Sequence, residues 1–176
     1  MTTLLAESTG TLTIAVGDQR LDELAFRSAA DIVVTGHSLV VVDAAGCFDP
    51  ARMTHSARIG ALDPAGLMRH LHIIRARTAD ELELAIGQQI ETAFMRFGTR
   101  QVLITDLLGA LYDNAISTRD ASHILGRIKL KLEELAEMGA QIVVLCRPAE
   151  RDLGTRAHFM SSLRASADRV YLRSNT

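Results

Sequence analysis

Three groups of residues in this sequence could act on a ligand that contains phosphate. Gly17 follows the first β-rich run, and Asp106 follows a later apolar run at residues 102–105. A turn that begins with glycine could bring backbone N–H groups to a phosphate, and an aspartate at a strand end could cap the loop at that edge of the sheet. The third group follows Cys146, and its guanidinium groups could contact phosphates. It consists of Arg147, Arg151 and Arg156.

A working phosphate-binding loop would also need a lysine after the first strand. The lysines of this chain are Lys129 and Lys131, far from that strand. After Gly17 the chain continues as Asp18-Gln19-Arg20, without a second glycine, a lysine, or a Ser or Thr for magnesium. Asp18 would cap a helix well but would repel an anion. We therefore expect this loop to be degenerate.

The elements that would position these residues alternate between strands and helices. Apolar or β-rich runs predict strands at residues 11–16, 39–43, 71–75, 102–106, 142–146 and 170–173. Continuous apolar runs are typical of parallel strands that are buried on both faces. The pattern predicts an α/β fold, a three-layer sandwich with a mainly parallel, twisted sheet and helices on both faces.

Three helices are expected between these strands. Apolar residues from Leu21 to Ala29 recur at helical spacing, and Thr78 with Glu81 forms a capping box for a helix that ends at Gly98. The third runs from about residue 118 to 138, with Gly139 as its stop. We expect its charged side chains to form a solvated face with pairs along the helix. They are Arg127, Lys129, Lys131, Glu133, Glu134 and Glu137.

Length and composition predict a single domain over residues 1–176. Of the 176 residues, 48% are hydrophobic, which is enough for a substantial core. The net charge of −2 excludes the general attraction to nucleic acid that a very basic protein would have. Arginines outnumber acids from residue 147 onward, so we expect a mildly basic edge there.

The cysteines and histidines have simple interpretations. Cys47 and Cys146 each follow an apolar strand, and with no signal-like N-terminus or long apolar span we expect a cytoplasmic protein with reduced thiols, not a membrane protein. His70 and His72 could share a metal with His55 or Cys47 as a third ligand. Ordinary histidines are the simpler interpretation, and we predict no metal site.

Several segments carry a family resemblance when they are taken in order. Residues 40–52 read as an apolar strand followed by D-x-E-G-x-F-x-P-x-R, except that Ala45 replaces the glutamate. Further segments are Leu-Asp-Pro at 62–64, which reads as a helix start, Ile-Ile-Arg-Ala at 73–76, Val-Leu-Ile-Thr-Asp at 102–106 and Ala-Ser-Ala-Asp-Arg-Val-Tyr-Leu-Arg at 165–173. In this order and spacing they resemble the RecA/RadA recombinase family over most of residues 10–173.

The resemblance implies a RecA-like P-loop NTPase fold that has lost its catalytic residues. Gly17 would be the first glycine of a lysine-less Walker A loop, and Asp106 would end the Walker B strand as the acid on the magnesium side. An acid that only caps the loop at this edge is the alternative for Asp106. Ala45 occupies the position of the glutamate that activates water, and a methyl group cannot accept a proton. Cys146 and Arg147 stand where the family has an Asn-Gln pair that senses the γ-phosphate. Losing lysine, glycines and base together leaves no route to phosphoryl transfer, so Gly17 and Asp106 would be vestigial.

The resemblance also implies where DNA would bind. In this family the loops after the fourth and fifth core strands touch single-stranded DNA, and their counterparts here are residues 108–118 and 147–158. The second loop contains Arg147, Arg151 and Arg156, diluted by Glu150 and Asp152. A solvated arginine-rich loop, without DNA contact, explains these residues equally well.

We therefore expect a catalytically inactive accessory or regulatory factor in DNA recombination and repair. Its partners would be single-stranded DNA and a protein such as a recombinase, or a second copy of the chain. One alternative is a protein-interaction scaffold, a pseudo-ATPase that does not bind DNA. Another is a sensor that binds ATP and Mg²⁺ without hydrolysis, although we expect no resident cofactor.

Overall fold

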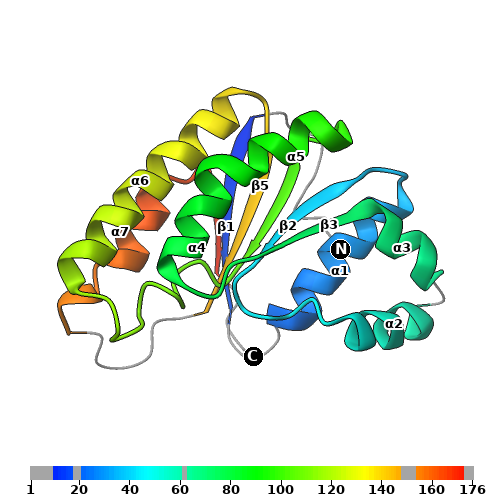
Figure 1. The fold of residues 1–176 in the computed structure, drawn as a ribbon, viewed down its shortest axis with the longest axis horizontal. Helices are drawn as coiled ribbons and strands as arrows, with labels where there is room; N and C mark the ends of the chain where they lie inside the picture. Colours follow the sequence, from blue (N-terminus) through cyan, green and yellow to red (C-terminus); the bar gives the residue numbers. More distant parts are fainter. Residues whose placement is uncertain (1–9, 18–20, 61–62, 148–153, 173–176) are drawn as a thin grey trace.

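The structure is a computed structural model that describes residues 10–17, 21–60, 63–147 and 154–172. Its centre is a six-stranded sheet in the order β3-β2-β4-β5-β1-β6, in which every neighbouring pair is parallel. The strands are β1 (Thr11–Val16), β2 (Leu39–Asp43), β3 (Leu71–Arg75), β4 (Gln101–Thr105), β5 (Gln141–Cys146) and β6 (Arg169–Leu172). The predicted parallel sheet is confirmed, with strand ends within one residue of those expected (Figure 1).

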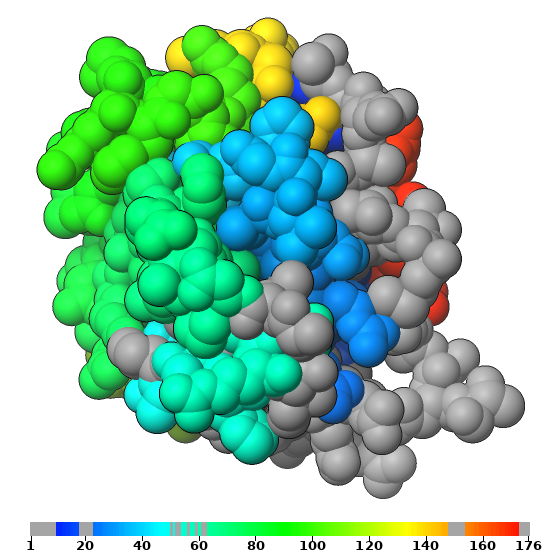
Figure 2. Space-filling view, turned by 90° about the vertical axis from the view of Figure 1, so that its right-hand side faces the viewer, coloured from blue at the N-terminus to red at the C-terminus, as the bar shows by residue number. Residues whose placement is uncertain are grey.

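Helices cover both faces of the sheet, so the predicted three layers are confirmed (Figure 1). One face packs against α1 (Leu21–Val34), α2 (Pro50–Ile59) and α3 (Pro64–His70). Figure 2 shows α2 and α3, in cyan to teal, beside α1. The other face packs against α4 (Ala79–Leu84), the π-helical turn η1 (Ala85–Gln89), α5 (Ile90–Phe97), α6 (Thr118–Glu137) and α7 (Phe159–Ala165).

Burial on both faces explains the continuous apolar runs of the strands. In β2, Val40 and Val42 belong to the apolar cluster on the α6 side, whereas Leu39 and Val41 belong to the cluster on the α1 side. Successive side chains of a strand point to opposite faces. Every residue of β2 is buried, so neither face can accept the polar alternation of a half-exposed strand.

Several helices begin or end at the capping residues and glycines that the sequence predicted. The Thr78 hydroxyl accepts from the Glu81 N–H, and the Glu81 carboxylate accepts from the Thr78 N–H, which completes the capping box. Gly98 ends α5 in the left-handed region with φ of 64°. Gly139 follows α6 with φ of 88°, where a side chain would be strained.

Two short helices and one irregularity were not anticipated. Helix α2 begins at Pro50, inside a segment interpreted only as a loop, and α7 begins at Phe159 just after the arginine-rich segment. The π-helical turn η1 interrupts the predicted helix between α4 and α5, and no Pro or Gly-Ser pair announces it.

The charged face of α6 differs from the expected set of pairs along one helix. Lys131 does pair with Glu134 at 3.2 Å, one turn away. Its ammonium also pairs with Glu91 of α5, and Arg127 forms two bonds with Glu83 of α4. These interhelical pairs tie α6 to its neighbours, which spacing within one helix could not indicate.

Two further expectations concern the thiols and the membrane. Cys47 is half-buried and Cys146 is buried, and both are free thiols. Within the described residues, no helix combines the length and apolar character needed to cross a bilayer.

Candidate functional site

The candidate site lies at the carboxyl edge of the sheet, where the predicted residues come together from three strands. Gly17 follows β1, Asp106 follows β4 and Arg147 follows β5, and these strands are adjacent in the order β4-β5-β1. The chain leaves β1 toward α1 on one face and leaves β5 toward α7 on the other. In open parallel sheets, ligand crevices form where neighbouring connections separate in this way.

Gly17 extends the pairing between β1 and β5. Its N–H donates to the carbonyl of Cys146 at 3.1 Å. Residues 18–20, on which the prediction of a degenerate loop rests, lie outside the described residues. Helix α1 begins at Leu21, so the connection from the strand to the helix is short.

Asp106 forms an ion pair with Arg147 across the ends of β4 and β5. The Arg147 Nε lies 3.6 Å from the Asp106 Oδ2, and the two side chains are 52% and 16% exposed. The Asp106 N–H donates to the Leu145 carbonyl at 2.7 Å, which holds the aspartate against β5. The Asp106 carboxylate therefore lies at the predicted edge of the sheet, and the Arg147 guanidinium lies beside it.

The backbone at Asp106 is strained. Its φ is 50°, and it is the one non-glycine residue with positive φ in the described part of the chain. A Cβ at Gly109 would lie 2.7 Å from the Asp106 Oδ2, so a side chain at this position would displace the carboxylate. Strained residues of this kind cluster at functional sites because their surroundings hold them in place.

Asp43 organises the loop after β2, a role that sequence reasoning missed. The side chain is buried, its Oδ1 accepts from the Cys47 N–H at 2.9 Å and from the Thr105 hydroxyl at 3.0 Å, and its Oδ2 accepts from the Phe48 N–H at 3.1 Å. The Thr105 Oγ1 in turn accepts from the Ala45 N–H at 3.2 Å. This network fixes Ala45 against β4. An aspartate as the last residue of an otherwise apolar strand was the available signal, because a buried polar group needs hydrogen-bond partners.

Arg156 has a structural role that sequence reasoning did not indicate. It is 8% exposed, and its guanidinium donates to the carbonyls of Leu111 at 3.0 Å, Asp113 at 2.7 Å and Ile116. Its Nε also donates to the Thr118 hydroxyl at 3.3 Å. The side chain thus closes the loop between β4 and α6 and is turned away from solvent. We therefore leave Arg156 out of the proposed DNA contact.

The other two predicted DNA-contact residues, Arg147 and Arg151, have different outcomes, and the aromatic residue of the neighbouring loop makes an internal contact. Arg151 lies outside the described residues. Arg147 is exposed and lies at the carboxyl edge, so it stays a candidate. Tyr112, the aromatic residue of the loop after β4, packs its ring 6.1 Å from that of Phe159, so it presents no free platform for a base.

Burial leaves two weak acids protonated beneath this edge. Burial raises the pKa of Cys146 to about 12, and the charge of Asp106 adds to the effect. Burial also raises the pKa of Tyr112 to about 12, with smaller contributions from Cys146 and Asp106. The Tyr112 hydroxyl is buried without a hydrogen-bond partner. Neither group can act as a nucleophile or base at neutral pH.

The histidine pair considered as metal ligands has other contacts. The His72 ring stacks on Phe97 with centroids 3.4 Å apart, and the His70 Nδ1 lies 3.4 Å from the Ser38 hydroxyl. Burial lowers the pKa of His72, and the nearby charges of His70 and Arg96 lower it further. Among the described residues, no group of three His, Cys, Asp or Glu side chains could hold a metal ion.

Comparison with known proteins leaves the family open. No protein-family model matches this chain, and no curated protein is significantly similar to it. The relationship to the RecA/RadA family therefore rests on the sequence motifs, and we treat it as a hypothesis.

Proposed function

We propose that this protein is a catalytically inactive RecA/RadA-like domain that acts by binding, as an accessory or regulatory factor in DNA recombination and repair. The observation that carries the proposal is the use of two described edge carboxylates, Asp43 and Asp106, in internal contacts. Asp43 is bound by two loop N–H groups and a hydroxyl, and Asp106 is paired with Arg147. Asp43 is buried and Asp106 faces a guanidinium, so neither carboxylate is placed as a free general base for water.

The positions of the lysines support the same conclusion. Both lie on α6, where Lys129 contacts the Ser162 hydroxyl at 3.0 Å and Lys131 pairs with Glu91. Phosphoryl transfer depends on positioning and on neutralising the charge of the phosphates. Side chains committed to helix–helix contacts do not supply that charge after Gly17. Binding, and not turnover, is thus the function that this edge supports.

Fluorescence anisotropy of labelled single-stranded DNA tests the DNA part of the proposal. We expect micromolar binding that weakens as salt rises, because phosphate contacts release counterions. Arg147→Ala and Arg151→Ala should each weaken it. Arg164→Ala is the matched control, since Arg164 is also exposed but lies on α7. A failure to bind at low salt would remove DNA contact from the proposal.

A second candidate function is a scaffold that binds protein and not DNA. It is favoured by the burial and pairing of the arginines at this edge. Arg156 is buried, and the charge of Arg147 is partly balanced by Asp106. Little free positive charge then remains among the described residues at the ends of β4, β5 and β1. Normal folding together with no DNA binding at low salt would favour this candidate over the first.

A further inference from the structure

Helix α6 carries one exposed stripe on the side turned away from the sheet. The buried residues Ile124, Ile128, Leu132 and Leu135 face the core. The stripe lies opposite, and its members alternate at intervals of four and three residues, which keeps them on one face of a helix. They are Arg119, His123, Gly126, Leu130, Glu133 and Glu137, and every one is exposed.

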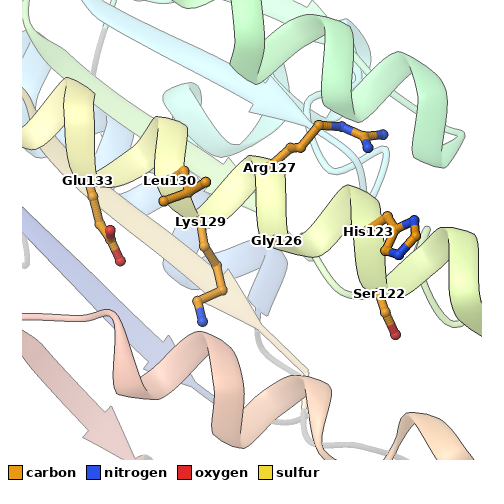
Figure 3. Close-up of a pocket in the computed structure, with 7 residues that line it drawn as sticks. All are labelled: Ser122, His123, Gly126, Arg127, Lys129, Leu130 and Glu133. Atoms are coloured by element: carbon orange, nitrogen blue, oxygen red, sulfur yellow. The ribbon is translucent and has the colours of Figure 1, made fainter.

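The middle of the stripe combines a hollow with an apolar projection. Gly126 lies in the hollow, and a Cβ built on it would meet no atom within 4 Å. Leu130, one turn further along, is 62% exposed. Figure 3 shows the hollow, with Arg127 and Lys129 turned to opposite sides and Gly126 bare between His123 and Leu130. An exposed leucine beside an open glycine is the shape of a helix-packing contact without its partner.

The neighbouring cations are already used within the chain. Arg127 pairs with Glu83 of α4, and Lys129 contacts Ser162 of α7. The charged ends of the stripe are different, because Arg119, His123, Glu133 and Glu137 make no ion pair among the described residues. These charges are thus available to a partner.

The stripe is complementary to itself when two copies run antiparallel. We propose that the protein forms a homodimer in which α6 packs against the partner's α6 about a two-fold axis near residue 128. Gly126 then receives the partner's Leu130, His123 faces the partner's Glu133, and Arg119 faces the partner's Glu137. A two-fold axis repeats each contact, so one stripe supplies both halves of the interface.

The charge pattern selects this orientation and this occupant. The first half of the stripe carries the cation Arg119 and the imidazole of His123, which can donate a hydrogen bond, and the second half carries the anions Glu133 and Glu137. Parallel copies would place Glu133 and Glu137 against the same residues of the partner, where like charges repel. Antiparallel copies place opposite charges together and also align hollow with projection. A single axis satisfies all three pairs, which is the signature of a surface matched to a second copy of itself.

The size of the stripe sets the expected strength of the dimer. With a rise of about 1.5 Å per residue, the stripe is roughly 27 Å long. One helix pair of that length buries less than the roughly 1,200 to 2,000 Å² of a standard stable interface. We therefore expect a dissociation constant in the micromolar range, and a monomer in dilute solution. This inference does not depend on the proposed function.

Sedimentation velocity of the full chain, over about 1 to 500 µM, tests the dimer. We expect a reversible monomer–dimer equilibrium. Arg119→Glu and Glu137→Arg should each raise the dissociation constant, and the double variant should restore it, because the swapped charges attract again. Leu130→Glu should raise it about tenfold or more. Met95→Glu, at an 82% exposed residue of α5 outside the stripe, is the control and should leave it unchanged.

The outcomes separate this interface from general association. A monomer across the whole concentration range would overturn the proposal. So would a double charge variant that stays as weak as the single variants, or equal effects of Leu130→Glu and Met95→Glu. Circular dichroism of each variant, compared with the parent chain, verifies that only folded protein is compared.

Discussion

Asp106 and Arg147 pair across neighbouring strand ends, with Nε and Oδ2 3.6 Å apart. The pair joins the acid that resembles a magnesium-side residue to the cation proposed to contact DNA. Each side chain therefore limits the other: the arginine occupies the carboxylate, and the carboxylate would repel a phosphate that approached the arginine. While the pair is intact, the two opposite charges offset each other, so neither side chain offers its full charge to a ligand.

Replacing Asp106 by Asn should open this edge toward anions. Asparagine tolerates the left-handed conformation that Asp106 adopts, so the backbone is expected to keep its shape. Loss of a partly exposed ion pair costs about 0 to 1 kcal/mol of stability. With Arg147 released, the affinity for single-stranded DNA should rise in the anisotropy measurement, and the double variant with Arg147→Ala should lose the gain. Unchanged affinity in Asp106→Asn would contradict a DNA contact at Arg147.

Replacing Arg156 by Ala should destabilise the fold. The carbonyls of Leu111, Asp113 and Ile116 would lose their donor in a buried setting, which costs about 2 to 4 kcal/mol. Urea unfolding followed by circular dichroism measures this loss. Arg164→Ala, at an exposed arginine, should stay within about 0.5 kcal/mol of the parent. Equal midpoints for the two variants would show that the buried contacts do not hold the loop.

Thr105→Val should loosen the loop after β2 while the core shape is kept. The hydroxyl donates to Asp43 and accepts from the Ala45 N–H, and valine can do neither. Because the buried Asp43 carboxylate loses a donor and the part-buried Ala45 N–H loses its acceptor, we expect a loss of about 1 to 3 kcal/mol. Hydrogen exchange should rise at Ala45 first. If protection there is unchanged, the network does not fix that loop.

Stability should fall in alkaline solution because of Cys146. The folded pKa of about 12 lies above the ordinary value of 9.0, so this contribution is complete below about pH 9 and is lost as the pH rises toward 12. The limiting slope is about 1.4 kcal/mol per pH unit. Denaturant unfolding at a series of pH values measures it. Cys146→Ala should flatten the alkaline limb, and a parallel decline in both proteins would assign the effect to other groups.

Tyr112→Phe tests the burial that raises the pKa of Tyr112, and the property measured is stability at neutral pH. The hydroxyl is buried without a partner, so removing it takes away a desolvation cost and keeps the ring against Phe159. We expect equal or slightly higher stability at neutral pH, by up to about 1 kcal/mol. A clear loss of stability in urea unfolding would mean that the hydroxyl is hydrogen-bonded in solution.

The strands could be predicted from the sequence because a strand that is buried on both faces consists of consecutive apolar residues. Strands such as β2 are continuous apolar runs, and Thr78 with Glu81 marks a helix start through contacts only three residues apart. These signals are local. The order in which the strands lie was not predicted, because pairing between distant segments leaves no such local signal.

The site was harder to anticipate because its decisive contacts are long-range. Sequence patterns placed Gly17, Asp106 and Arg147 at strand ends, and these do lie at one edge. The burial of Arg156 depends on carbonyls about 40 residues earlier in the chain, which residue type and spacing do not encode. The same holds for Asp43 and Thr105, which meet across two strands.

The place of β1 in the sheet has a consequence for synthesis of the protein. Its two neighbours, β5 and β6, are made more than 120 residues later, and Leu12 and Asp168 exchange hydrogen bonds that lock this late partner in place. A ribosome-bound chain could thus pair β2 with β3 and β4 while β1 still has no partner. Strand β1 can join the sheet only after β5 is made, and we expect this long-range pairing to slow folding.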